Sequence, residues 1–469
     1  VPEVVRQRED LESPLDDAEI RTLKSKITGG SGTLDDYHSL AEMYKRLILK
    51  LQREDMRENL ETLKQPVSDI RMDERDVGKL FRVTAPLRIG ISSANASDNH
   101  TRSKEKGAKT LNAGVDLAFY GKEAIPPLIV TGMRLNEVLL RLRSESSDFS
   151  DEFEVRTGDD LSEVRERFFA YRRGGDEALR LVKQALVHVG IVRDTSDDVI
   201  GDIRRFTGGG GLELVTASRV QQGSGLGTSS ILAAAILKVL YRMAGLSQGY
   251  REGEYPDLYD QSLLLEQSIG LNSGWQDARG AYGGASAIKD FYAPPGAGLP
   301  APDVTFLMEV APEEFQRRVV LFNTGIARFA TRGLNVVLDV YLCRDEERYP
   351  AIVESMQIHD DIVTALRAGD YDGLGRLATR YWELRYTIDP DATNATIQYI
   401  FEAQEIAGRI TGGLVTGAGG GGFALLVAKE GKTEELKRCL NNLRRREEYA
   451  RGGVVEYRLN AEGITLTET

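Results

Sequence analysis

The stretch Gly223–Ser230, GSGLGTSS, has a composition that suits phosphate binding. Glycines allow a sharp backbone turn and let its N–H groups approach a ligand closely. A helix that begins directly after such a turn adds unpaired N–H donors and a partial positive charge, and both favour an anion. The hydroxyls of Ser229 and Ser230 are placed to meet a phosphate or its Mg²⁺. The alternative interpretation is an ordinary glycine-containing loop with a serine N-cap.

Two carboxylates further along the chain, Glu266 and Asp277, suggest metal and proton chemistry. Glu266 comes late in an apolar helical stretch, where a buried carboxylate needs a partner. Asp277 lies in a turn that contains several glycines and a tryptophan. Each carboxylate alone is most often a salt-bridged or capping acid. Together, behind a phosphate-type loop, they suggest a metal ligand and a general base.

A long polar stretch, Ser92–Lys109, is the third candidate. A polar loop of this length between strands is unusual unless it is functional or disordered. Its residues would suit hydrogen bonding to a hydroxyl-rich ligand, and they include Asn95, Ser97, Asp98, Asn99, His100 and Arg102. The alternative interpretation is a solvated, charged loop.

Local sequence patterns predict the elements that position these residues. Alternation and β-branched residues favour strands at 81–84, 87–91, 111–118, 127–131, 212–220, 319–322 and 423–427. Apolar periodicity favours helices at 33–60, 161–173, 176–189, 231–241, 258–269, 332–342, 349–368, 371–389, 394–407 and 432–446. The pair Ala85-Pro86 permits only a sheet edge or a bulge. The acidic and polar segment 144–160 is expected to be a surface excursion.

Length and composition exclude several classes of protein. A chain of 469 residues with 41% apolar residues is expected to form two to three domains with real cores. A net charge of −12 argues against general nucleic-acid binding. No apolar run is long enough to span a membrane, and the first ten residues lack the apolar core of a secretory signal.

The cysteine and histidine content also bears on the chemistry. Two cysteines, Cys343 and Cys439, have no metal-binding spacing and suit a reducing cytoplasm. The four histidines are scattered, which makes a histidine-based metal centre improbable. Residues 1–78 are highly charged and predict an amphipathic helical appendage without a constellation of chemical groups.

Three motifs in this order resemble the GHMP family of small-molecule kinases, over roughly residues 80–430. The first is the strand Ala85–Ile89, APLRI, with the loop residue Asp98 behind it. The second is GSGLGTSS, which is similar to the family's phosphate-binding GLGSS core with Thr228 in place of a serine. The third is Thr416–Phe423, TGAGGGGF. Glu266 and Asp277 follow the second motif in the same order as the family's metal-binding Glu and catalytic Asp.

Within this family the chain resembles the kinase domains of L-fucokinases and the heptose kinases. The shared stretches are GSGLGTSSILA, LEQSIGLNSGWQDARGAYGG and NTGIARFA. The first motif departs from those kinases, which carry a GGWTDTPP-like run where this chain has SSANASDNH. A one-residue insertion would align Ser97-Asp98 with the Thr-Asp of that run. The departure leaves the acceptor sugar open.

The resemblance implies an α+β fold of two domains with the active site in the cleft between them. The expected division is 1–78 for the appendage, 79–300 for the N-terminal kinase domain and 301–469 for the C-terminal one. It further implies ATP as the phosphoryl donor and Mg²⁺ as the metal. The expected site residues are, for the ATP phosphates, Gly223, Ser224, Gly225, Leu226, Gly227, Thr228, Ser229 and Ser230.

The other roles are carried over in the same way. Ser230 and Glu266 are expected to hold Mg²⁺, Asp277 to accept or orient a hydroxyl proton, and Arg88 to stabilise charge near the transferred phosphoryl group. The expected sugar-binding and loop residues are Asp98, Asn99, His100, Gly417, Gly419 and Gly420. For Arg88 the alternative is a structural ion pair.

The resemblance therefore implies an ATP-dependent sugar kinase, with the anomeric hydroxyl as acceptor and a homo-oligomer as one possible state. Two alternatives stay open. One is a heptose-type or uronic-acid sugar 1-kinase, and the other is a non-catalytic nucleotide or sugar sensor with the same fold. No nucleic-acid or membrane partner is expected.

Overall fold

The computed structural model describes residues 71–469 apart from 74–75, 94–102, 104, 119–121, 148, 174–177, 222, 246–257, 272–273, 297–301, 327–335, 338–339 and 342–344. Before residue 71 it describes 22–23, 25–27, 29–33, 35–40 and 43. Among these residues no helix is both long and apolar enough to cross a lipid bilayer.

The first layer is a six-stranded sheet whose strands run in the order β14-β1-β4-β7-β5-β6. The strands are β1 (Leu80–Ala85), β4 (Leu128–Leu135), β5 (Leu139–Glu145), β6 (Ser150–Arg156), β7 (Gly211–Ser218) and β14 (Thr465–Glu468). All neighbours are antiparallel except β5 and β7, which are parallel. Strand β7, which leads to the glycine turn, lies inside this sheet between β4 and β5, and its alternating pattern predicts a strand.

The second layer is an eight-stranded sheet in the order β11-β12-β10-β13-β3-β8-β9, with β2 paired to β3 beside this path. Its strands are β2 (Leu87–Ser92), β3 (Ala108–Ala118), β8 (Ile288–Ala293), β9 (Asp303–Phe306), β10 (Val319–Asn323), β11 (Ile410–Val415), β12 (Phe423–Ala428) and β13 (Gly453–Leu459). Pro86 separates β1 from β2, so the chain changes sheets there. Because proline cannot donate to a ladder, this is a place where a strand must end.

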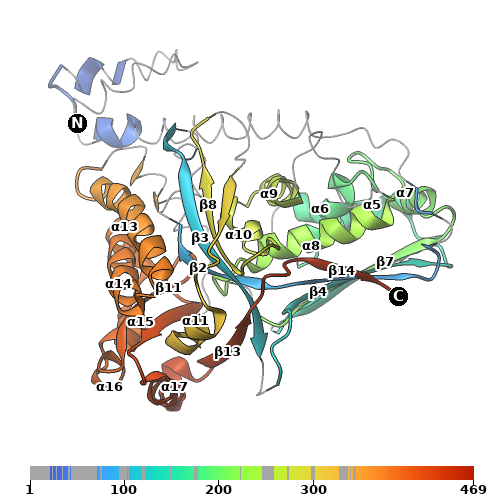
Figure 1. Ribbon diagram of the computed structural model, residues 1–469. Coiled ribbons are helices and arrows are strands. Elements are labelled where there is room, and N and C mark those ends of the chain that lie inside the picture. Colours follow the sequence, from blue (N-terminus) through green and yellow to red (C-terminus); the bar gives the residue numbers. More distant parts are fainter. Residues whose placement is uncertain are drawn as a thin grey trace.

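Helices cover one face of the six-stranded sheet (Figure 1). They are α5 (Leu161–Phe168), α6 (Arg180–His188), α7 (Val199–Phe206), α8 (Thr228–Met243) and α9 (Leu258–Ser268). The central helix, α8, packs on β1, β4 and β7 and is buried along most of its length. Its alanines allow this close approach to the sheet and favour the helical state.

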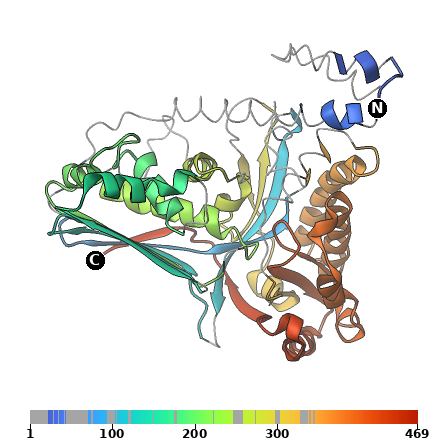
Figure 2. The ribbon, with the colours of Figure 1, turned by 180° about the vertical axis from the view of Figure 1, so that it is seen from behind.

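A second helical layer covers the β11–β12 end of the other sheet (Figure 2). Helix α14 (Tyr371–Ile388) packs on β11 and β12, and α13 (Tyr349–Arg367) packs on α14. Further helices in the described part of this half include α11 (Pro312–Arg318), α15 (Ala395–Glu402), α16 (Gln404–Ala407) and α17 (Thr433–Asn442). The predicted helix at 394–407 is two helices, because extended backbone at Ala403 interrupts it.

The two halves of the chain share their sheets. Strand β13 pairs with β3, and β14 pairs with β1, so residues after 450 join strands that begin near residue 80. Each of the two sheets therefore contains strands from both sides of the boundary expected near residue 300. The division at 79–300 and 301–469 stays a prediction.

The expectation for residues 144–160 was wrong. This segment forms the end of β5 and all of β6, an antiparallel pair at the edge of the six-stranded sheet. Phe153 and Val155 are buried, while the acidic residues that alternate with them pair with arginines, Glu154 with Arg141 and Glu152 with Arg143. Alternation of buried apolar and exposed charged residues is typical of an edge strand. In the sequence the many charged residues make this alternation difficult to recognise.

The sequence patterns also missed α7, α11, β8, β9, β11, β13 and β14, and they predicted a turn where the short helix α10 (Gln276–Arg279) lies. In the N-terminal part, Ile27 and Leu40 form a small buried cluster with Leu23 and Met43 packed against it. Most of the predicted helix at 33–60 lies outside the described residues.

Candidate active site

The glycine turn adopts a backbone conformation that suits its composition. Gly223, Gly225 and Gly227 have φ values of 73°, 75° and 73°, in the left-handed region that favours glycine. Gly227 is the N-cap of α8, and no side chain caps this helix end among the described residues. The first N–H groups of a 16-residue helix are therefore available to a ligand.

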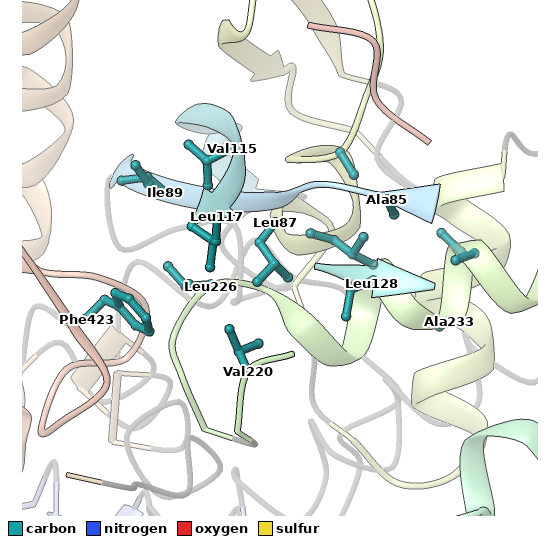
Figure 3. Close-up of a cluster of buried hydrophobic side chains, with 14 of the residues drawn as sticks. Ala85, Leu87, Ile89, Val115, Leu117, Leu128, Val220, Leu226, Ala233 and Phe423 are labelled. Carbon is teal, nitrogen blue, oxygen red and sulfur yellow. The ribbon is translucent and has the colours of Figure 1, made fainter. Parts of the chain in front are cut away.

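Leu226 anchors the turn rather than lining it. Its side chain is fully buried and points into the hydrophobic cluster with Leu87, Leu117 and Val220 (Figure 3). Its carbonyl accepts a hydrogen bond of 3.1 Å from the backbone N–H of Arg88. Leu226 thus fixes the glycine turn to β2, and of Leu226 itself only the backbone can take part in binding.

The third glycine motif packs directly on the turn. A Cβ on Gly225 would lie 2.7 Å from the carbonyl oxygen of Thr416, and one on Gly417 would lie 2.9 Å from the Cα of Gly225. A Cβ on Gly422 would lie 2.4 Å from the carbonyl oxygen of Ser224. These approaches leave no room for side chains, so the two motifs, almost 200 residues apart in the sequence, form one structure.

Gly419 and Gly420 lie on the other side of the same loop. Gly420 donates its N–H to the carbonyl of Ala392, and a Cβ on Gly419 would lie 2.9 Å from the Trp382 ring. Their surroundings are therefore α14 and the residues after it, whereas Gly417 contacts the glycine turn.

Arg88 lies beneath the turn, 3% exposed, and pairs with Asp277. Its Nη1 also donates to the carbonyl of Gly225 at 3.3 Å. Two glycines pack against the aliphatic part of the Arg88 side chain. A Cβ on Gly227 would lie 3.1 Å from the Arg88 Cγ, and a Cβ on Gly280 would lie 2.5 Å from it. The buried Nε has no hydrogen-bond partner among the described residues, and neither has the hydroxyl of Thr416.

Glu266 meets both serines of the motif. Its carboxylate accepts hydrogen bonds from the hydroxyl of Ser229, at 2.5 Å, and from that of Ser230. Glu266 is 1% exposed, and Ser262 on the same helix donates to the carbonyl of Ser230 at 2.6 Å. The predicted metal ligands thus form one cluster of oxygen atoms between α8 and α9.

Asp277 belongs to α10 (Gln276–Arg279), a helix of a single turn. Two side chains of β3 hold its first residue: Asn112 donates to the carbonyl of Gln276 at 3.1 Å, and Thr110 donates to its side-chain oxygen at 3.3 Å. Asp277 therefore faces Arg88 from a short element that lies on the buried face of the second sheet.

The structure thus brings together Arg88, Asp277, the turn 223–230, Glu266 and the loop 416–422. Asp98, Asn99 and His100 lie outside the described residues. The third motif includes Thr416, but the sequence patterns assign no role to its buried hydroxyl, and they do not reveal two contacts at the end of β2. There Ser93 bonds the Tyr381 hydroxyl at 3.0 Å, and Ser92 bonds His359 at 3.1 Å. No local pattern signals such contacts.

Two segments of the chain match models of one protein family. Residues 192–285 match the model of the GHMP kinases N terminal domain, and residues 362–444 match that of GHMP kinases C terminal. The chain is 33% identical over 369 residues to a bifunctional fucokinase/GDP-fucose pyrophosphorylase from Arabidopsis thaliana. That alignment covers 76% of this chain and 31% of the relative, so the chain spans about a third of the relative's length.

Two solved structures are similar in fold. A galactokinase from Lactococcus lactis, complexed with galactose, has a TM-score of 0.55 and 16% identity, over 83% of this chain and 96% of its own. A D-glycero-D-manno-heptose 1-phosphate kinase from Bacteroides thetaiotaomicron has a TM-score of 0.52 and 20% identity, over 82% and 98%. These similarities confirm the mixed α and β fold that the motifs imply.

Proposed function

Because the chain belongs to the GHMP kinases, a family of ATP-dependent phosphotransferases, we propose that it transfers the γ-phosphoryl group of ATP to a monosaccharide. The acceptor we propose is the anomeric hydroxyl of L-fucose or a related sugar, which gives a sugar 1-phosphate. The fucokinase relative supports this choice of acceptor. The observation that carries the proposal is the contact of Arg88 with both the Gly225 carbonyl and the Asp277 carboxylate, which joins the donor turn to a base.

The residues around the turn fit a phosphate. The uncapped start of α8 offers backbone N–H groups, and the buried Arg88 Nε and Thr416 hydroxyl stand beside it without hydrogen-bond partners among the described residues. A buried donor without a partner costs roughly 1–3 kcal/mol. Phosphate oxygens are strong acceptors that would satisfy such donors.

The cluster of Ser229, Ser230 and Glu266 fits Mg²⁺. This ion prefers oxygen ligands and usually binds one or two carboxylates together with substrate phosphates and waters. In this cluster the carboxylate of Glu266 and the hydroxyls of Ser229 and Ser230 are the oxygen ligands that the protein would supply. When bound, Mg²⁺ would neutralise charge on the phosphates of ATP.

The transfer step follows from the positions of Asp277 and Arg88. The oxygen of the sugar hydroxyl forms a bond to the γ-phosphorus while the bond from that phosphorus to the bridging oxygen of ADP breaks. Asp277 accepts or orients the proton that the hydroxyl loses. Arg88, held at 3.3 Å from the Gly225 carbonyl, stabilises negative charge that develops beside the turn.

Replacing Asp277 tests the proposed base. Asp277→Asn keeps the size of the side chain but cannot accept the proton, so kcat is expected to fall about 10²–10⁴-fold. ATP binding, measured by isothermal titration calorimetry, is expected to persist, because the N–H groups of the turn remain. The exposed Asp303 on β9 gives the control variant Asp303→Asn, which is expected to keep wild-type turnover. Near-normal turnover of Asp277→Asn would contradict the role of Asp277 as the general base.

A screen of acceptors tests the reaction itself. ADP release is measured with ATP and Mg²⁺ against L-fucose, L-galactose, D-arabinose, manno-heptoses and uronic acids. ADP release with L-fucose supports the proposal. A preference for a heptose or a uronic acid would contradict L-fucose as the acceptor and identify that sugar in its place. Binding of ATP and of a sugar without ADP release would indicate a sensor and contradict the proposed kinase.

A further inference from the structure

The helix that carries Asp277 cannot hold its own position. Helix α10 has four residues. An isolated helix of this length is not stable in water, because the free-energy cost of helix nucleation exceeds the stabilisation from the hydrogen bonds of a single turn. Its place must therefore come from the side chains that contact it. Thr110 and Asn112 of β3 hold its first residue, Gln276.

The other end of α10 lies over Lys289, on the neighbouring strand β8. Asn112 on β3 is the register partner of Lys289, and Gly114 is that of Arg88 on β2. Side chains two residues apart on a strand share a face, so Arg88, Asn112 and Lys289 project from the same face of this sheet. All three are buried, at 3%, 0% and 0% exposure.

The amine of Lys289 reaches the turn that follows α10. It donates to the carbonyl of Gly280 at 3.1 Å and to that of Tyr282. Gly280 in turn lies against the stem of Arg88, because a Cβ there would come within 2.2 Å of the Arg88 Cβ. Lys289 therefore fixes the backbone that supports both members of the Arg88–Asp277 pair.

This arrangement is costly for the protein. Burial lowers the pKa of the Lys289 amine to about 7, because a charged amine is poorly solvated there. The charged side chains of the elements packed on Lys289 have other partners or are exposed: Lys109 pairs with Asp360, Asp116 with Arg458, Arg279 with Asp260, Asp277 with Arg88, Asp290 with His359, and Asp303 is exposed. The hydrogen bonds to the carbonyls of Gly280 and Tyr282 thus offset part of the cost of burying the Lys289 amine.

We propose that Lys289 is a positioning residue for phosphoryl transfer, which holds the turn at Gly280 and Tyr282 so that Asp277 and Arg88 stay aligned at the donor site. This inference rests on the proposed function, since it takes Asp277 as the base. Lys289 contacts neither the turn 223–230 nor Glu266 in any described interaction, so its effect is expected on kcat and not on ATP binding.

Kinetics of Lys289→Met test this inference. Methionine has a similar length but no donor, so the turn loses both hydrogen bonds. The expected result is a kcat lowered by roughly 10–100-fold, the scale of a misplacement of about 1 Å. The KM for ATP is expected to change less than about twofold, because uniform ATP binding is intact. Lys289→Gln, which keeps a shorter donor, is expected to recover part of kcat.

A second buried lysine supplies the control. Lys183 on α6 is 3% exposed and donates to the carbonyl of Arg167 at 3.0 Å, away from α10. Lys183→Met is expected to lower the melting temperature while leaving kcat unchanged. A kcat for Lys289→Met equal to that of the wild type, or a loss matched by Lys183→Met, would overturn the positioning role.

Hydrogen exchange separates this inference from the proposed function. In Lys289→Met, amide exchange over residues 276–282 is expected to be faster than in the wild type, and unchanged exchange there would overturn the inference. If the wild-type chain phosphorylates no sugar, the proposed function fails, and exchange alone decides whether Lys289 fixes the turn.

The pH dependence of stability gives a further readout. In the unfolded chain the amine has its ordinary pKa of 10.5, against about 7 in the fold. Between these values the unfolded chain binds more protons, so the free energy of unfolding gains from this group as pH rises from about 7 to about 10.5. This gain is expected to be missing in Lys289→Met, and an identical pH profile would count against a buried amine.

Discussion

Both oxygens of the Glu266 carboxylate are taken by the hydroxyls of Ser229 and Ser230. A metal ion that enters this cluster must replace hydrogen bonds that the three side chains already make with one another. The cluster therefore holds the oxygen atoms together before any metal binds, which lowers the ordering cost of binding.

Glu266→Gln is expected to raise the Mg²⁺ concentration needed for half-maximal turnover, because the amide is a weaker ligand and carries no charge. The measurement is a Mg²⁺ titration of initial rates at fixed ATP. Glu313→Gln, at an exposed position of α11, is the control and is expected to leave the titration unchanged. A Glu266→Gln titration that overlays the wild type would remove this residue from the metal site.

The residues of the candidate site differ in how far the sequence reveals them. Ser229, Ser230, Glu266 and Asp277 lie in motifs of close spacing, and the structure brings them to the same region as Arg88. Lys289 lies in no motif, and Thr416 lies in the third motif without a predicted role, since the role of each depends on carbonyls and glycines that only the fold places beside them. From the alternating pattern of a strand alone, a lysine is predicted to face solvent, so the burial of Lys289 could not be predicted.

At the scale of elements, two glycine loops meet backbone to backbone. The approach of Gly417 to Gly225, and of Gly422 to Ser224, ties the start of α8 to the strand β12 that follows the second loop. The two loops therefore form one packed structure, and the shape of the proposed ATP site depends on both.

Gly225→Ala is expected to weaken ATP binding at least about tenfold, because its Cβ would collide with the Thr416 carbonyl and force an unfavourable backbone conformation. Isothermal titration calorimetry with ATP measures the effect. Gly245→Ala is the matched control: Gly245 has a similar φ of 68°, but a Cβ there meets nothing within 4 Å. Equal losses in the two variants would show that backbone strain alone, and not the contact of the loops, explains the result.

Elements with a strong period were predictable, and those with a mixed pattern were not. Helix α8 and strand β7 follow their apolar periods closely. The hairpin of β5 and β6 was missed because Arg141 and Glu154 satisfy each other across the strands, a pairing that local composition cannot show.

At the scale of the molecule, His359 on α13 joins elements from both halves. It is fully buried, and its two ring nitrogens lie 3.1 Å from the hydroxyl of Ser92 on β2 and 3.1 Å from the carboxylate of Asp290 on β8. The helical layer of the C-terminal half is thereby attached to the strands that lead into the candidate site.

His359→Phe is expected to lower the free energy of unfolding by about 1–3 kcal/mol, because Ser92 and Asp290 lose a buried partner. Urea unfolding monitored by circular dichroism measures it. Asp360→Asn, on the same helix, removes the ion pair with Lys109, where the Asp360 side chain is 50% exposed. This control is expected to cost less than about 1 kcal/mol, and a cost equal to that of His359→Phe would contradict the role given to the buried histidine.

The pairing of β14 with β1 has a consequence for how the protein is made (Figure 1). Strand β1 lies near residue 80, and its edge on this side can be paired only after residues 465–468 have been synthesised. An unpaired strand edge next to a hydrophobic sheet is a site for aggregation, and pairing over such a separation in sequence is slow. A chain in which β1 has formed but residues 465–468 have not yet joined it therefore exposes an open strand edge, a feature that favours aggregation during folding.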